Sequence, residues 1–235
     1  MSELQKTQTE LLNMSLQKTS CKLQLTFAGG SVSRRLGEAV DRLQVFSVNN
    51  KAISGGGLLE SNKDVMRRSK LINLNQLVNE KNLVIQVGGN DFFVHTKNGK
   101  HITSFQTFND KYSQDQFADA IQDFLRKFSG GSVWFVLLFP RYLKKCCDKH
   151  VDEIGLQKAN DLVNDVNTMI KKQVDFFNRE MGKSIFFLDL QLLHGLENRE
   201  ALSIDNIHLM DTANDICAEK IISYILTNTG HALTN

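Results

Sequence analysis

The sequence predicts an α/β fold in which a parallel sheet of five strands lies between two layers of helices. Short apolar runs alternate along the chain with longer stretches of helical periodicity, and this alternation is typical of βαβ units. Several apolar runs also end in glycine or asparagine, as buried strands do where the chain turns away from a sheet. No internal repeat or low-complexity linker interrupts the pattern, so we expect a single domain over residues 21–230.

Five strands are expected, each followed by a turn. They are the runs KLQLTFAG (22–29), RLQVFSVNN (42–50), NLVIQVGGND with its closing glycines (82–91), SVWFVLLF (132–139) and SIFFLDL (184–190). Continuous apolar strands of this kind are buried on both faces of a parallel sheet. The run 132–139 is the strongest, and it stops at Pro140, the only proline, which cannot donate to a strand ladder.

Helices are expected between these strands. One is expected directly after Ser31, with Ser31 in the capping position, and apolar residues at helical spacing predict others over 61–80, 117–128 and 153–180 and from 212 onward. The polar stretch 95–113 is expected to be a surface excursion. Residues 1–20 are polar and are expected to form a mobile arm or the end of a longer helix, with too few heptad leucines to establish a coiled coil.

Composition and charge exclude several classes of protein. The formal net charge is only +2, so the molecule as a whole does not have the field of a nucleic-acid or membrane-binding protein. Local basic pairs could still form a nucleic-acid patch; they are Arg34–Arg35, Arg67–Arg68, Lys144–Lys145 and Lys171–Lys172. The four cysteines form no C-x-x-C pair, so no metal site is expected. No secretion signal or membrane span is evident, which predicts an intracellular protein.

The predicted strand ends carry the residues with the most chemistry. FAGGS (27–31), NNKAISGGG (49–57), VGGND (87–91) and SIDNIHL (203–209) follow the first, second, third and fifth strands. Because the carboxyl ends of parallel strands meet at one edge of the sheet, and ligands bind beyond that edge, we expect these segments to converge on one site.

Their side chains are compatible with nucleophilic catalysis. Ser31 would lie at the positive end of a helix, where developing negative charge is favoured. His208 could accept its proton, and Asp205 could orient the imidazole. The Asn90 amide, with the backbone N–H groups of Ser31 and Gly55, could form an oxyanion hole. Taken singly, each residue also has a structural interpretation, because serine and aspartate cap helices and asparagine and glycine form turns.

The four segments together resemble the SGNH (GDSL-type) hydrolase family. FAGGSVSRRL lies where that family has its Gly-Asp-Ser block, and VGGNDF and DNIHL resemble its Gly-x-Asn-Asp and Asp-x-x-His blocks. The resemblance implies a flavodoxin-like three-layer sandwich, Ser31 as nucleophile in a triad with His208 and Asp205, and no cofactor. Gly30 replaces the family's usual aspartate, and Leu209 replaces a frequent proline.

The expected function is therefore a serine esterase or deacylase acting on a small-molecule or lipid ester. Residues expected near the substrate are Arg34, Arg35, Gly56 and Asp91, and an arginine facing the pocket would indicate an anionic substrate. Two alternatives stay open. One is an SGNH-like domain that binds RNA or another partner. The other is an esterase domain of a retrotransposon protein, because domains of the family that this sequence resembles occur in some retrotransposon proteins behind a coiled coil.

Overall fold

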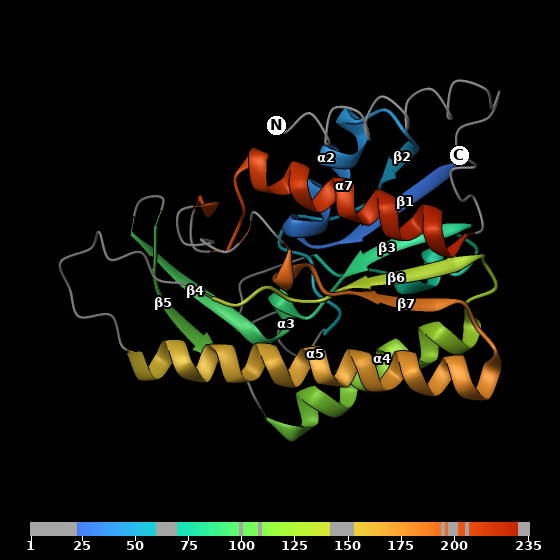
Figure 1. Cartoon of the computed structure of the whole chain (residues 1–235). Coiled ribbons are helices and arrows are strands. Elements are labelled where there is room, and N and C mark those ends of the chain that lie inside the picture. Colours follow the sequence, from blue (N-terminus) through green and yellow to red (C-terminus); the bar gives the residue numbers. More distant parts are fainter. Residues whose placement is uncertain are drawn as a thin grey trace.

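The computed structural model describes residues 23–59, 70–98, 101–107, 110–141, 153–193, 196, 202–204 and 207–229. It confirms the predicted fold class, because a five-stranded parallel sheet lies between two layers of helices (Figure 1). The sheet order is β2-β1-β3-β6-β7, which places the first strand between the second and third. The proposed boundary at residue 21 lies outside the described residues and stays a prediction.

The five strands are shorter than the apolar runs that predicted them. Their bounds are β1 (Gln24–Gly29), β2 (Ser47–Asn50), β3 (Asn82–Gln86), β6 (Ser132–Val136) and β7 (Ile185–Leu188). All four neighbouring pairs are parallel, so every strand delivers its carboxyl end to the same edge of the sheet. The second strand begins late because the preceding helix continues through Arg42.

Two helices cover each face of the sheet (Figure 1). On one face lie α2 (Ser31–Arg42) and α7 (Asp211–Asn228), and on the other lie α4 (Lys111–Lys127) and α5 (Glu153–Met181). The side chains of β6 alternate between the two cores, Trp134 toward α2 and α7 and Phe135 toward α4 and α5. Both are buried, as expected for strands covered on both faces. No helix in the described part of the chain is long and apolar enough to cross a membrane.

The predicted helix over 61–80 is wrong in its described part, residues 70–80. Leu71 forms a parallel bridge with Gly57, and only a 3-10 turn, η1 (Leu74–Leu77), follows. Two hydrogen bonds, one to the loop after β2 and one local, compete with helix formation. The Ile72 N–H donates to the Gly57 carbonyl at 2.9 Å, and the Asn73 side chain accepts from the Asn75 N–H at 3.1 Å. Residues 60–69 lie outside the described part of the chain.

The stretch expected as a surface excursion contains a β-hairpin. Its strands β4 (Phe93–Asn98) and β5 (His101–Thr107) are antiparallel, and β5 contacts α5. The sequence held a signal for it, because an Asn-Gly dipeptide at 98–99 is the strongest short-range hairpin signal. The next helix, α4, begins six residues earlier than predicted, after Asp110 accepts a hydrogen bond from the Ser113 N–H at 2.8 Å.

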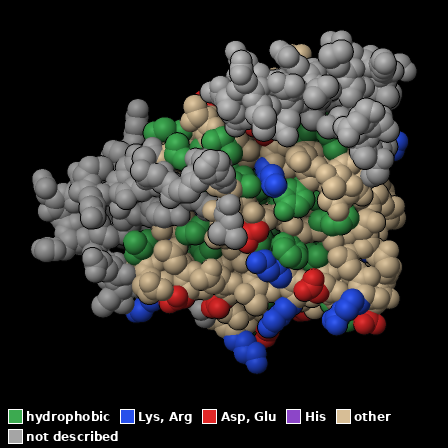
Figure 2. Space-filling model, viewed as in Figure 1, with side chains coloured by type: hydrophobic (Ala, Val, Ile, Leu, Met, Phe, Trp, Pro, Cys, Tyr) green, Lys and Arg blue, Asp and Glu red, His purple; other side chains and the backbone are tan. Residues whose placement is uncertain are grey.

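Strand β7 forms one edge of the sheet and exposes part of its apolar surface. Phe187 is 40% exposed, and the Lys171 ammonium lies 5.3 Å from the centre of its ring. Figure 2 shows hydrophobic side chains in the middle of this face, with lysines and arginines beside and below them. A strand of four residues with a cation over its aromatic side chain is a poor template for pairing with another chain.

Candidate active site

The chain turns sharply between β1 and α2 and places Ser31 at the start of the helix. Gly29 has φ of +123°, and a Cβ atom there would lie 2.1 Å from the Gln86 carbonyl oxygen, so only glycine fits. Gly30 occupies the cap position without a side-chain hydrogen bond, and Ser31 is the first helical residue. Ser31 is therefore not the helix cap, and its backbone N–H is among those a helix leaves without an intrahelical partner.

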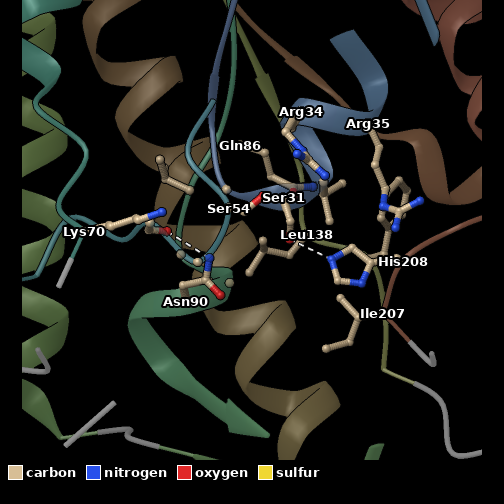
Figure 3. A pocket seen from close by; sticks show the side chains of 18 of the residues that line it. Ser31, Arg34, Arg35, Ser54, Lys70, Gln86, Asn90, Leu138, Ile207 and His208 are labelled. Carbon is tan, nitrogen blue, oxygen red and sulfur yellow. Dashed lines mark hydrogen bonds between the residues drawn. The ribbon is translucent and has the colours of Figure 1, made fainter. Parts of the chain in front are cut away.

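Ser31 and His208 contact each other across the site, although 177 residues separate them. The distance from Ser31 Oγ to His208 Nε2 is 2.6 Å (Figure 3). Two hydrogen bonds fix the backbone of His208. Its carbonyl accepts from the Ile204 N–H at 2.8 Å and from the Ser203 hydroxyl at 3.2 Å. Asp205, the predicted third member of a triad, lies outside the described residues.

Asn90 belongs to α3 (Gly89–Phe92), the short helix after β3, and lies on the opposite side of Ser31 from His208 (Figure 3). Its amide nitrogen donates to the Gly56 carbonyl at 2.9 Å, which fixes it against the Gly55–Gly56 turn that follows β2. Gly30 also packs closely against this amide, because a Cβ atom at that position would lie 2.9 Å from the Asn90 amide nitrogen. Three of the predicted segments thus meet where the sequence placed them.

Asp91 lies beneath the site rather than in the cavity wall. Its side chain is 2% exposed, and Oδ1 accepts from the Leu58 and Leu59 N–H groups at 2.5 and 2.8 Å. The other oxygen accepts from the Gly88 N–H at 3.0 Å. One buried carboxylate therefore ties the loop after β2 to the turn after β3. This is a positioning role, whereas the sequence had suggested contact with the substrate.

These groups surround an open cavity of about 610 Å³. Ser31, His208, Asn90, Gly55 and Gly56 line it, as do the predicted Arg34 and Arg35. Several other lining residues were not predicted from the sequence; they are Ser54, Lys70, Gln86, Leu138, Phe139, Arg141 and Ile207. Within the described residues, no cluster of three or more His, Cys, Asp or Glu side chains could hold a metal ion.

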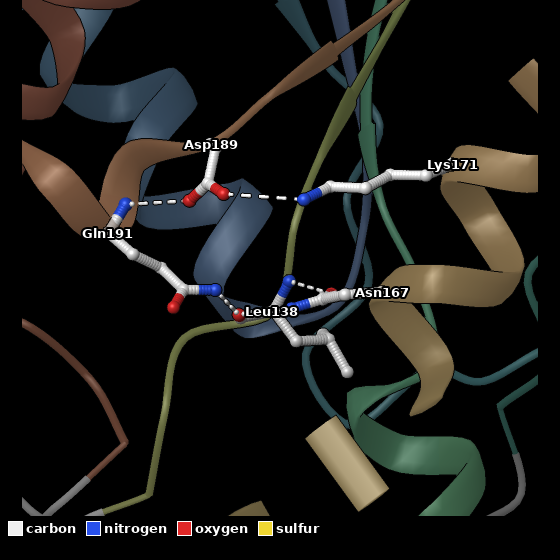
Figure 4. A network of polar contacts seen from close by, with 5 residues as sticks. All are labelled: Leu138, Asn167, Lys171, Asp189 and Gln191. Carbon is white, nitrogen blue, oxygen red and sulfur yellow. Dashed lines mark hydrogen bonds and ion pairs between the residues drawn. The ribbon is translucent and has the colours of Figure 1, made fainter. Parts of the chain in front are cut away.

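The wall that contains Leu138 and Arg141 is the carboxyl end of β6. From the sequence, only Pro140 indicated where this strand ends. The predicted strand over 132–139 is too long, because β6 ends at Val136. Side-chain amides hold the backbone instead: Asn167 accepts from the Leu138 N–H at 2.7 Å and donates to its carbonyl at 3.0 Å, and Gln191 donates to the same carbonyl at 2.9 Å (Figure 4). Because these donors lie on α5 and after β7, only the folded chain assembles this wall.

Asp189, a carboxylate at the end of β7, takes part in the same network. It accepts from the Gln191 N–H at 3.1 Å and lies 3.6 Å from the Lys171 ammonium (Figure 4). Of these two partners, Gln191 supports the cavity wall, and Asp189 does not line the cavity itself. It therefore orients Gln191, which in turn holds the backbone at Leu138.

The arrangement of a serine, a histidine and an asparagine at one sheet edge agrees with the sequence comparison. The model of the family described as GDSL-like lipase/acylhydrolase matches residues 23–221. The chain belongs to this family. No curated protein is similar enough in sequence to count as a match. The description of the family names lipases and acylhydrolases, which are hydrolases.

Solved structures share the GDSL hydrolase fold at low sequence identity. A member of the lipolytic G-D-S-L family from Veillonella parvula has a TM-score of 0.50 and 15% identity, covering 86% of this chain and 97% of that one. An extracellular lipase from Streptomyces rimosus has a TM-score of 0.50 and 12% identity, covering 86% and 99%. Phospholipase A1 from Streptomyces albidoflavus has a TM-score of 0.50 and 12% identity, covering 87% and 99%. At these identities the likeness establishes the fold.

Proposed function

We propose that the protein is a serine esterase that hydrolyses carboxylic esters by way of an acyl-enzyme. The observation that carries the proposal is the 2.6 Å contact between Ser31 Oγ and His208 Nε2 in a cavity at the helix terminus. A serine hydroxyl is a weak nucleophile until a base takes its proton, and this contact supplies the base. Family membership and the lipase and phospholipase neighbours support ester hydrolysis as the reaction.

In the first half of the reaction, Ser31 Oγ attacks the ester carbonyl carbon and its proton passes to His208 Nε2. The resulting tetrahedral intermediate collapses when the carbon–oxygen bond to the alcohol breaks. His208 gives its proton to the departing oxygen, so the alcohol leaves neutral and Ser31 carries the acyl group. Asp205 is proposed to orient the imidazole through its other ring nitrogen.

In the second half, a water molecule takes the place of the alcohol. His208 Nε2 accepts a proton from this water while its oxygen attacks the acyl carbon. The second tetrahedral intermediate releases the carboxylic acid, and the proton on His208 returns to Ser31 Oγ. The side chains end in their starting state, so the proposed cycle needs no cofactor.

The negative charge on each tetrahedral intermediate is proposed to be held by the Ser31 and Gly55 N–H groups and the Asn90 amide. All three residues line the cavity, and Asn90 is already fixed by its bond to the Gly56 carbonyl. Donors held in place before the reaction stabilise the transition state without having to reorganise, and loss of one such donor typically lowers kcat by about 10²–10³-fold.

Substitution of Gly30 tests this oxyanion hole, because a side chain introduced at position 30 would displace the Asn90 amide. We expect Gly30→Ala to lower kcat for 4-nitrophenyl acetate by about tenfold or more, since a Cβ atom would approach the amide nitrogen to 2.9 Å. Gly30→Asp, which restores the family's usual residue, is expected to lose activity as well. Steady-state kinetics of the variants measure both effects.

The control for this prediction is the double variant with Asn90→Ala. If Gly30→Ala acts through Asn90, combining the two substitutions lowers kcat little further than Asn90→Ala alone. Full activity of Gly30→Ala, or additive losses in the double variant, would show that the glycine does not serve the position of the amide.

A fluorophosphonate probe tests the nucleophile directly. Such a probe forms a stable bond with a serine whose proton is removed by a neighbouring base, and we expect one label per chain on Ser31, located by peptide mass spectrometry. Prior denaturation should abolish labelling, because a free serine is unreactive. Label on another serine, or none on the folded protein, contradicts the proposed mechanism.

The alternative of an RNA-binding domain is favoured by no specific observation. Of the four basic pairs, Arg67–Arg68 and Lys144–Lys145 lie outside the described residues. Arg34 and Arg35 line the candidate cavity, and Lys171 is engaged with Asp189 and Phe187. The alternative stays a prediction, and retention on RNA that weakens steeply with salt would support it.

A further inference from the structure

Cationic side chains are concentrated around the candidate cavity. Four of its lining residues are Arg34, Arg35, Lys70 and Arg141, and no Asp or Glu is among the lining residues that the structure describes. The whole chain has almost balanced charge, with 28 Lys and Arg against 26 Asp and Glu. The concentration is therefore local. A cleft lined by one sign of charge attracts ligands of the opposite sign.

Arg141 is built into the cavity wall more firmly than the other three. Its side chain is 4% exposed, and the guanidinium lies 4.6 Å from the centre of the Phe93 ring. Asn160 clamps its backbone, accepting from the Arg141 N–H at 2.6 Å and donating to its carbonyl at 3.2 Å. A guanidinium held in place at a cavity wall can donate charge-assisted hydrogen bonds to a bound anion.

The position of Arg141 indicates which part of an ester it would contact. A Cβ atom at Gly89 would lie 3.4 Å from an Arg141 terminal nitrogen, so the guanidinium lies beside the residue that precedes Asn90. Figure 3 shows Lys70 on the Asn90 side of Ser31, whereas Arg35 lies on the His208 side. His208 protonates the departing alcohol in the proposed mechanism, so the alcohol occupies its side. Arg141 and Lys70 then flank the acyl part.

We propose that the preferred substrate is an ester with an anionic group, such as a carboxylate, in its acyl part, bound by Arg141 and assisted by Lys70. This inference rests on the proposed esterase function. It assigns specificity to two residues that take no part in proton transfer. Arg34 and Arg35 contribute to the overall attraction of anions. Arg34 Nε lies 3.7 Å from Glu38 Oε1.

The test compares two chromogenic esters that differ in one charge. Mono-4-nitrophenyl adipate carries a free carboxylate at the end of its acyl chain, and 4-nitrophenyl methyl adipate has the same chain with that group masked. We expect kcat/KM to be at least about tenfold higher for the anionic ester, because hydrogen bonds to charged groups are among the strong ones. Rising salt should reduce the preference.

Substitutions then assign the effect. Arg141→Gln and Lys70→Gln should each reduce the ratio of kcat/KM values for the anionic and neutral esters, and Arg141→Lys should restore part of it. Arg126→Gln is the matched control, since Arg126 lies on α4 outside the cavity and should keep the ratio of the natural protein. If Arg141→Gln does not fold, the ratio of kcat/KM values measured for Lys70→Gln and for the natural protein still tests the proposal.

Each other outcome has a definite meaning. A ratio of one or below in the natural protein overturns the proposal. Preference for 4-acetoxy-3-nitrobenzoate over its methyl ester, without preference for the adipate, overturns the assignment to the acyl side. Failure to hydrolyse any of these esters contradicts the esterase function instead. In that case, calorimetric titration with monomethyl adipate and dimethyl adipate tests the charge preference alone, and equal or absent binding rejects it.

Discussion

Replacing Ser31 with alanine is expected to lower kcat for 4-nitrophenyl acetate by at least about a thousandfold, because the variant has no atom that can form the acyl-enzyme. The fold should be retained, since the Ser31 side chain does not cap the helix. The substitution removes only the hydroxyl that contacts His208. The measurement is steady-state turnover of the ester together with fluorophosphonate labelling, which should be absent.

His208 provides the companion experiment. Groups that act as one unit give non-additive losses, so His208→Gln should resemble Ser31→Ala, and the double variant should be little worse than either. Ser47→Ala is the matched control, because Ser47 is exposed on β2 and does not line the cavity. Turnover in Ser31→Ala equal to that of the Ser47→Ala protein would refute the nucleophilic role.

Replacing Asp91 with alanine is expected to lower the free energy of unfolding by about 3 kcal/mol or more. The substitution leaves the N–H groups of Leu58, Leu59 and Gly88 without their carboxylate acceptor, and each unsatisfied buried donor costs about 1–3 kcal/mol. For a chain of this length the midpoint of thermal unfolding should fall by roughly 6–12 °C. Urea and thermal denaturation measure the change.

The same variant should lose activity even where it remains folded. Asp91 ties together the segments that bear Gly55 and Asn90, so its loss should lower kcat more than it raises KM. Asp91→Asn keeps one acceptor oxygen and should lie between the natural protein and Asp91→Ala in stability. A loss below about 1 kcal/mol for Asp91→Ala would mean that these bonds contribute no more than an average hydrogen bond.

The strands were predicted from the sequence more accurately than the segments that connect them. The runs 82–91 and 132–139 predicted strands that the structure contains in shorter form, because strands covered on both faces are nearly continuous in apolar residues. The helix predicted over 61–80 failed in its described part because Leu71 and Ile72 bind the loop near Gly57, a contact that local periodicity does not encode. The hairpin was missed although Asn98-Gly99 signalled it.

The candidate site shows the same division. Ser31, Asn90 and His208 were predictable because each follows a strand, and parallel strands bring their carboxyl ends to one edge. Arg141 also follows a strand, but nothing near it in the sequence says that Asn160 and Phe93 hold it in the cavity wall. Lys70 lies in the segment wrongly predicted as helix, and the bond from the Gly57 N–H to its carbonyl holds it beside the cavity.

The sequence by itself determined the fold class, the family resemblance and the chemical types gathered at the sheet edge, because these depend on local apolar patterns and on residues adjacent to strand ends. Tertiary structure alone decided that Asp91 lies beneath the cavity as a tether, and that Lys70 and Arg141, from two other segments, line it together with Arg34 and Arg35. The physical reason is that burial and charge concentration arise from contacts between residues far apart in the chain, which no local pattern encodes.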